Sequence, residues 1–156
     1  MFIDANIFLF VILRNPRYGG RCKKLLDSIR KEGIKVYTSV NAAEEVVYKT
    51  MMFELVEKYD IEFREIKSFL KKKPEVISEL EKPWKALNVI KNSVKILDVK
   101  SDDLIESGKL SKRYSLLPSD SLIVAVMKRN NIGVIATTDS DFERVDGIKI
   151  WMPETS

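Results

Sequence analysis

Short apolar segments alternate along the whole chain with segments of helical periodicity, and this alternation restricts the fold more than any other feature. Five segments have the pattern of strands, namely residues 2–3, 34–38, 94–97, 133–137 and 148–151. Between them apolar residues recur at helical spacing, as at Cys22, Leu25, Leu26 and Ile29. Strands separated by helices pair in parallel, because each connection must cross over the sheet. We therefore predict an α/β fold with a mostly parallel, about five-stranded sheet that is covered by helices on both faces.

One stretch, residues 61–92, is helical in pattern and highly charged. Pro74 separates two apolar stripes within it, and Pro83 is predicted to end or kink the second helix. The chain of 156 residues fits one domain. We therefore expect a single domain over residues 1–156, with residues 61–92 as a helical insert.

Histidine is absent from the chain, and Cys22 is its one cysteine. These counts exclude Ser-His-Asp and Cys-His catalysis, zinc sites of the Cys/His type and a disulfide framework. The net charge of +4 permits an anionic partner such as nucleic acid without requiring one. No apolar run approaches the roughly 18 residues of a membrane helix, and no signal peptide is visible. We expect a cytoplasmic protein whose acid–base or ligand groups are mostly Asp, Glu, Lys or Tyr.

Acidic side chains come from four separate segments to the sheet edge where parallel α/β proteins bind ligands. They are Asp4, Glu44 or Glu45, Asp120, and Asp139 or Asp141. Asp120 belongs in this group because a helix that enters a parallel strand starts near the carboxyl edge of the sheet. An all-oxygen cluster without histidine or cysteine suits Mg²⁺ or Mn²⁺, and such a site supports metal-assisted phosphoryl transfer.

Each acid also has a purely structural interpretation. Asp4 could cap the helix after the first strand, and the helix dipole alone favours Asp120 in a first turn. Asp98, Asp102 and Asp103 also follow a strand, but their pattern is typical of a helix cap. A receiver-like phosphoacceptor domain is a further alternative, since it shares the α/β plan and Asp98 stands after the third strand. No P-loop motif occurs.

Four segments resemble the motifs of the PIN-domain family, in the order and spacing of that family. Residues 2–6 (FIDAN) are similar to its hhDxN opening, and residues 136–142 (ATTDSDF) are similar to its TxDxDF segment. Between them, Ser39 followed by Glu45 resembles the second motif, and residues 117–125 (LPSDSLIVA) resemble the third, xxxDxxIxA. Any one motif is weak, whereas all four in order are fairly specific.

The resemblance implies a three-layer α/β/α sandwich and a Mg²⁺- or Mn²⁺-dependent ribonuclease that hydrolyses RNA phosphodiesters. A stand-alone domain of this length is similar to VapC-like toxins of type II toxin–antitoxin systems, which pair with a small antitoxin and often dimerise. The implied catalytic acids are Asp4, Glu45, Asp120 and Asp139. The implied metal ligands are Asp4, Asp120, Asp139 and Asp141. The residues that would support them are Asn6, Ser39 and Thr137, with Glu44 as the alternative to Glu45.

Other interpretations stay open at this point. The insert at residues 61–92 could be a lid over the site, or a surface for a second copy or an antitoxin. Lys71, Lys72 and Lys73 could contact the RNA backbone, or could simply be a solvated helix face. The nuclease could process RNA outside a toxin pair, and an inactive interaction module is the remaining class.

Overall fold

Five parallel strands form one sheet in the order β3-β2-β1-β4-β5, in a computed structural model that describes residues 1–154. The strands are β1 (Phe2–Ile3), β2 (Tyr37–Ser39), β3 (Lys95–Leu97), β4 (Val134–Ala136) and β5 (Lys149–Trp151). The chain first adds β2 and β3 on one side of β1, and later adds β4 and β5 on the other side. The strand order therefore reverses between β1 and β4, which is where open α/β sheets form their ligand crevice.

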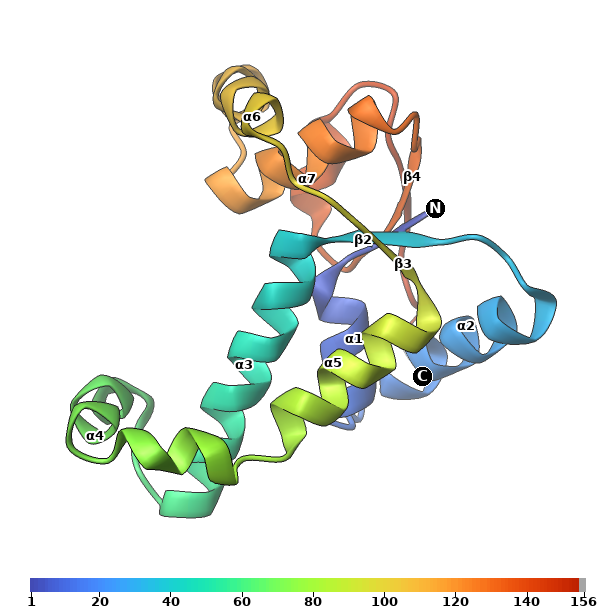
Figure 1. Ribbon diagram of the computed structural model, residues 1–156. Helices are drawn as coiled ribbons and strands as arrows, with labels where there is room; N and C mark the ends of the chain where they lie inside the picture. Colours follow the sequence, from blue (N-terminus) through green and yellow to red (C-terminus); the bar gives the residue numbers. More distant parts are fainter. Residues whose placement is uncertain (155–156) are drawn as a thin grey trace.

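The helices lie on both faces of this sheet, as predicted (Figure 1). They are α1 (Ala5–Ile12), α2 (Gly19–Glu32), α3 (Val40–Tyr59), α4 (Ile66–Lys72), α5 (Lys82–Ser93), α6 (Ser101–Tyr114) and α7 (Pro118–Arg129). Short 3-10 turns occupy Phe63–Glu65, Pro74–Glu79 and Ser140–Arg144. Within the described range 1–154, no helix combines the length and the apolar character that crossing a membrane requires.

The alternation of side chains along each strand builds two cores, one on each face of the sheet. Phe2 and Ile135 are buried on the face that α6 and α7 cover. Their neighbours Ile3 and Ala136 are buried on the opposite face, against α1, α2 and α5. Burying a side chain such as Phe2 or Ile3 contributes about 1.5–3 kcal/mol. The result is the predicted three-layer α/β/α sandwich.

Helix α3 is much longer than the sheet needs, and it carries a third cluster beyond the two cores. Its 20 residues span about 30 Å. It runs from the sheet edge to residues 61–81, which we call the arm (Figure 1). A small core packs the arm against α3 and consists of Met52, Leu55, Ile66, Val76 and Leu80. The molecule thus has a sheet-centred body and a helical arm joined by one continuous helix.

The prediction for Pro83 is wrong, because this proline lies in the first turn of α5 and begins the helix there. A proline is compatible with the first turn, where a backbone N–H has no intrahelical partner. Helix α5 then buries Ala86 and Ile90 in the same core as α1 and α2. The structure thus divides the range 61–92 between the arm and a helix of the sandwich.

Candidate active site

Asp4 is held at the carboxyl end of β1 by hydrogen bonds that cross the reversal point of the sheet. Its Oδ1 accepts from the backbone N–H of Ala5 (2.7 Å), so Asp4 caps α1. Its Oδ2 accepts from the Thr137 hydroxyl (2.6 Å) and from Asn6 Nδ2 (2.8 Å). Asn6 Nδ2 also donates to Thr137 Oγ1 (2.9 Å). Residues 131 or more positions apart therefore orient one buried carboxylate.

Two of the acids at this edge, Asp4 and Asp120, have raised pKa values. Burial is the main cause that raises the pKa of Asp4 to about 6, and the charges of Glu45 and Asp139 raise it further. Burial also raises the pKa of Asp120 to about 6, with contributions from Asp139, Asp4 and Glu45. The hydrogen bond from Thr137 lowers the pKa of Asp4 and so opposes the effect of burial there. We call Asp4, Glu45, Asp120 and Asp139 the acidic edge.

A pocket of about 590 Å³ opens at the acidic edge. The residues that line it are Asn41, Glu44, Glu45, Tyr48, Leu117, Ser119, Asp120 and Asp139. Asp4 adjoins it through Thr137, whose Oγ1 also accepts the N–H of Asp139 (3.0 Å). The fold thus brings together the four segments that the sequence predicts, and α3, α7 and the segment after β4 each contribute a carboxylate to one cavity.

Of the two adjacent glutamates, Glu45 is the better candidate for the site acid. Its charge acts on both Asp4 and Asp120, whereas the Glu44 side chain is exposed at the pocket wall. Glu45 also forms an ion pair with Lys49, one turn later on α3 (2.5 Å). The electrostatic coupling therefore agrees with the motif spacing.

Two basic side chains form ion pairs with acids of this region. Lys49 pairs with Glu45, and Arg144 pairs with Asp141 while donating to the carbonyl of Ser115 (2.6 Å). Within residues 1–154, no group of three or more Asp, Glu or Cys side chains stands in a metal-binding arrangement. For Glu45 or Asp141 to ligate a metal, each would have to exchange its cation partner for the ion.

The chemistry of the donors nevertheless fits a hard divalent cation. All of the acids offer oxygen, which Mg²⁺ and Mn²⁺ prefer. Close carboxylates with raised pKa values bind a cation that relieves their repulsion. Asn6 Oδ1 is a further oxygen, buried and without a hydrogen-bond partner. The assignment of Asp4, Asp120, Asp139 and Asp141 as ligands stays a prediction.

The polar groups around the pocket differ in part from those predicted. The Ser39 hydroxyl donates to Asn41 Oδ1 (2.7 Å) rather than to an acid. The sequence interpretation missed Asn41, Tyr48 and Ser119, which line the pocket. A signal existed for Tyr48, because it stands one helical turn after Glu45 and therefore shares its face of α3.

The remaining acidic and basic candidates lie elsewhere. Asp103 accepts from the N–H of Lys100 (2.8 Å) and pairs with Arg129 (2.7 Å), so its interpretation as a capping residue is confirmed. Asp98 follows β3, which is an edge strand. Lys71 and Lys72 end α4 in the arm, at the other end of α3 from the sheet (Figure 1). Lys73 follows them directly.

The strand order excludes the receiver-like alternative. Receiver domains have the order 2-1-3-4-5, in which β3 lies beside β1. Here β2 and β4 flank β1, and β3 lies outside β2. An acid after β3 is consequently separated from Asp4 by a whole strand, and the acceptor geometry of a receiver is not formed.

The fold and the site together define a parallel α/β protein with an oxygen-only acidic site at its topological reversal point. The PIN domain family matches residues 1–148, and the chain belongs to that family. The family resemblance of the sequence motifs is thereby confirmed.

Named relatives and solved structures agree with this assignment. The chain is 28% identical over 151 residues to Ribonuclease VapC6 of Methanocaldococcus jannaschii, covering 96% of this chain and 95% of the relative. Its fold is similar to VapC20 of Mycobacterium tuberculosis, described as a sarcin–ricin loop cleaving toxin (TM-score 0.63, 16% identity, 91% and 92% of the two chains). It is also similar to VapBC2 of Rickettsia felis bound to a promoter DNA fragment (TM-score 0.61, 17% identity, 97% and 96%).

Proposed function

We propose that this chain is a metal-dependent endoribonuclease that acts as the toxin of a toxin–antitoxin pair. The observation that carries the proposal is the convergence of four carboxylates on the β1–β4 edge, with Asp4 and Asp120 both raised in pKa to about 6. Four like charges in one place are costly unless a cation joins them. Membership of the PIN family and the VapC ribonuclease relatives support the reaction class.

In this proposal, the acids bind the metal and the polar residues beside them orient one carboxylate. Asp4, Asp120 and Asp139 hold Mg²⁺ or Mn²⁺, with Asp141 as an auxiliary ligand, and Glu45 completes the catalytic acids. When bound, the cation supplies a water of lowered pKa and neutralises charge on the phosphate. Thr137 and Asn6 fix the orientation of the Asp4 carboxylate, because both donate hydrogen bonds to its Oδ2. The bond from Thr137 also lowers the pKa of Asp4 against the effect of burial.

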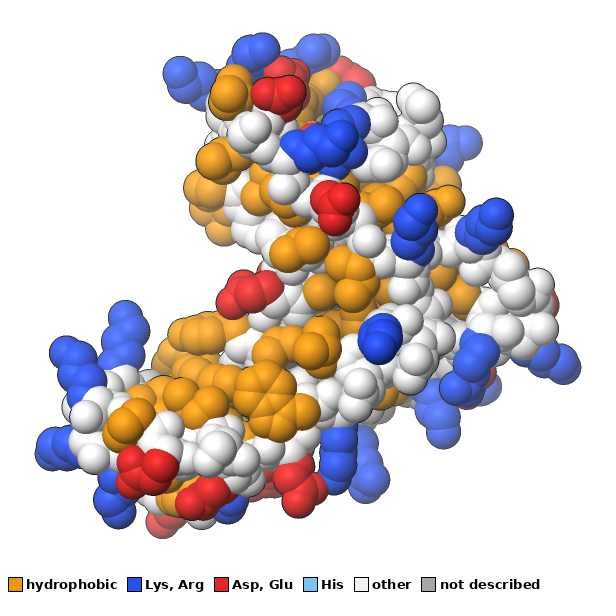
Figure 2. Space-filling model, viewed as in Figure 1, with side chains coloured by type: hydrophobic (Ala, Val, Ile, Leu, Met, Phe, Trp, Pro, Cys, Tyr) orange, Lys and Arg blue, Asp and Glu red, His pale blue; other side chains and the backbone are white. Residues whose placement is uncertain are grey.

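The arm and α5 offer the surface for a protein partner. Hydrophobic side chains form a band over α5 and the arm in Figure 2. Exposed apolar residues of these elements include Phe63, Trp84 and Leu87. Exposed apolar patches of this kind mark interaction sites. We assign this face to an antitoxin or to a second copy of the chain, and the VapBC structures among the neighbours favour the antitoxin.

The lysines that end α4 provide a path for the RNA backbone in the same proposal. Lys71, Lys72 and Lys73 are exposed, and blue side chains gather at the arm in Figure 2. If they bind phosphates, replacing all three with alanine makes the logarithm of the RNA affinity depend less steeply on the logarithm of salt concentration. An unchanged slope assigns them to a solvated helix face instead.

The test is cleavage of single-stranded RNA by the purified chain with Mn²⁺, with Mg²⁺ and with EDTA. We expect cleavage with either metal and none with EDTA. The D120N variant should be inactive, whereas D102N, which removes an exposed acid from α6, should cleave as the parent does. Metal-dependent cleavage by D120N would overturn the site.

The toxin role needs a separate experiment. Expression of the chain should arrest growth, and co-expression of a cognate antitoxin, sought as a small protein encoded beside this chain, should restore it. Cleavage without growth arrest would instead identify an RNA-processing nuclease outside a toxin pair.

A further inference from the structure

Tyr48 is an aromatic side chain that stays exposed at the wall of the acidic pocket. It lies on α3 one helical turn after Glu45, and 45% of its surface is accessible. Among the residues that line this pocket in the described chain, Tyr48 is the aromatic one. An exposed ring beside a phosphate-processing site offers a flat face on which a base can stack.

Asn41 supplies a second and independent observation at the same pocket. Ser39 holds its Oδ1 through a hydrogen bond, but its Nδ2 is buried and has no hydrogen-bond partner. A buried donor without a partner costs free energy and calls for an explanation, such as a bound acceptor. Ser119 adds a hydroxyl to the same wall. The pocket therefore combines a stacking face with hydrogen-bonding groups.

We propose that Tyr48 and Asn41 form a nucleobase subsite beside the acidic edge, in which the ring stacks on a base and the amide binds its edge. This inference rests on the proposed ribonuclease function and adds the residues that select the substrate. The base of a nucleotide whose phosphate lies among the carboxylates must lie next to them, since one ribose joins the two. Single-stranded RNA is recognised in this way, by stacking and by hydrogen bonds to base edges.

A side chain of a partner protein is the alternative to a base as the group that packs on the Tyr48 ring. The ring also lines a second, apolar pocket with Leu13, Met52, Phe53 and Phe63. That pocket suits a partner protein, but it contains neither Asn41 nor an acid. Asn41, whose Nδ2 has no hydrogen-bond partner, lines the acidic pocket and not the apolar one, and this favours a base over an apolar side chain there.

The experiment measures RNA binding in a D4N background, so that the probe is not cut. The probe is a fluorescently labelled single-stranded RNA of twelve nucleotides, together with versions that each lack one base. The variants are Y48A, Y48F and N41A, with F63A as the control because Phe63 is exposed in the apolar pocket alone. Circular dichroism checks that each variant is folded.

We expect Y48A to weaken binding about tenfold, while Y48F and F63A stay within about twofold of the background. Removing one particular base from the RNA should weaken its binding to the D4N protein by a similar factor. The same abasic RNA should bind the D4N protein that carries Y48A as well as the complete RNA does. N41A should change which base is preferred at that position.

Three results would overturn the subsite. The first is equal binding by Y48A and F63A while the parent chain cleaves RNA. The second is full additivity between Y48A and every abasic probe. The third is loss of binding to a protein partner in Y48A with RNA affinity unchanged. If the parent chain neither cuts nor binds any RNA, the proposed function fails first, and the subsite fails with it.

Discussion

The acidic edge and the arm lie at opposite ends of helix α3, and they are held together in opposite ways. At the start of α3, the edge depends on hydrogen bonds between residues far apart in sequence, such as Asn6 with Thr137. At the end of α3, the arm contacts elements only 20 to 28 positions away. The edge is a product of the whole sheet, whereas the arm depends on contacts that are local in sequence. We therefore expect the arm to loosen without disturbing the edge.

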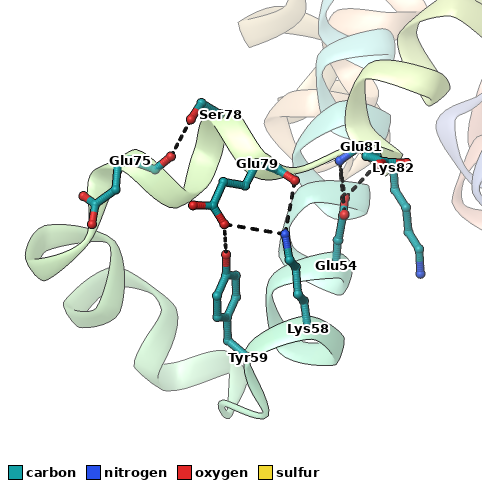
Figure 3. A network of polar contacts seen from close by, with 8 residues as sticks. All are labelled: Glu54, Lys58, Tyr59, Glu75, Ser78, Glu79, Glu81 and Lys82. Atoms are coloured by element: carbon teal, nitrogen blue, oxygen red, sulfur yellow. Dashed lines mark hydrogen bonds and ion pairs between the residues drawn. The ribbon is translucent and has the colours of Figure 1, made fainter.

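The contacts of the arm are shown in Figure 3. Glu54 on α3 is 7% exposed, and its carboxylate accepts from the backbone N–H groups of Glu81 (3.1 Å) and Lys82 (2.7 Å). It therefore satisfies donors at the start of α5 from another helix. Glu79 bonds the Tyr59 hydroxyl (3.0 Å) and pairs with Lys58 (3.7 Å) at the surface. Exposed pairs contribute little, so Glu54 is the main polar anchor.

The largest expected effect comes from a substitution in the acidic edge that should leave the arm unchanged. D4N removes a charge from the acidic edge with almost no change in shape. We expect kcat/KM for RNA to fall by about 10³-fold or more, since the transition state loses its charge stabilisation. Hydrogen exchange in the arm should remain that of the parent. Slowed or accelerated exchange there would show that the edge and the arm are coupled.

A smaller change sharpens the account of how the edge is held. T137V keeps the shape of Thr137 but removes the hydroxyl that donates to Asp4. We expect kcat/KM to fall about 10- to 100-fold, the usual range for a group that orients a metal ligand. The Mn²⁺ affinity, measured by calorimetry, should fall in parallel. A loss of activity at unchanged metal affinity would contradict the orienting role.

The complementary change loosens the arm alone. E54A leaves two N–H groups at the start of α5 without their acceptor, which costs about 1–3 kcal/mol. We expect faster hydrogen exchange over residues 61–81 and near-normal exchange in the strands. The matched control is E57A, because Glu57 is exposed and pairs with Lys82 only at the surface. If both variants speed hydrogen exchange over residues 61–81 equally, Glu54 is not the main polar anchor of the arm.

The smallest effect is a pH dependence that belongs to the edge. The pKa of Asp120 in the fold is about 6, above its ordinary value of 3.8, so between these values the folded chain binds a proton that the unfolded chain lacks. Proton uptake then stabilises the fold as pH falls. Without metal, D120N should be more stable than the parent at pH 8, by about 1 kcal/mol after solvent screening.

Urea denaturation with EDTA at several pH values measures this difference. The gap between D120N and the parent should close as pH falls from 6 to 4, and D102N should show no such gap. A gap that widens toward low pH would have the opposite sign and would contradict the raised pKa.

Local patterns predict much of this molecule. Periodicity predicted the five strands and the helices of the sandwich, and the four motifs predicted the family. The same reasoning failed at Pro83, because a proline is compatible with both the end and the start of a helix, and only packing of Ala86 and Ile90 decides between them. It also missed Tyr48 as a site residue, because the spacing that puts it on the same face of α3 as Glu45 does not show that its ring stays exposed.

By itself, then, the sequence determined the elements, the acids at their ends and the absence of imidazole, which leaves oxygen donors as the ligands for an ion. Tertiary structure alone decided the order of the strands, which puts Thr137 against Asp4 and leaves Asp98 a strand away. It also decided the burial that raises the pKa of Asp4 and Asp120. The physical reason is range: periodicity records neighbours within a turn or two, whereas burial and charge repulsion depend on segments that meet only in the folded sheet.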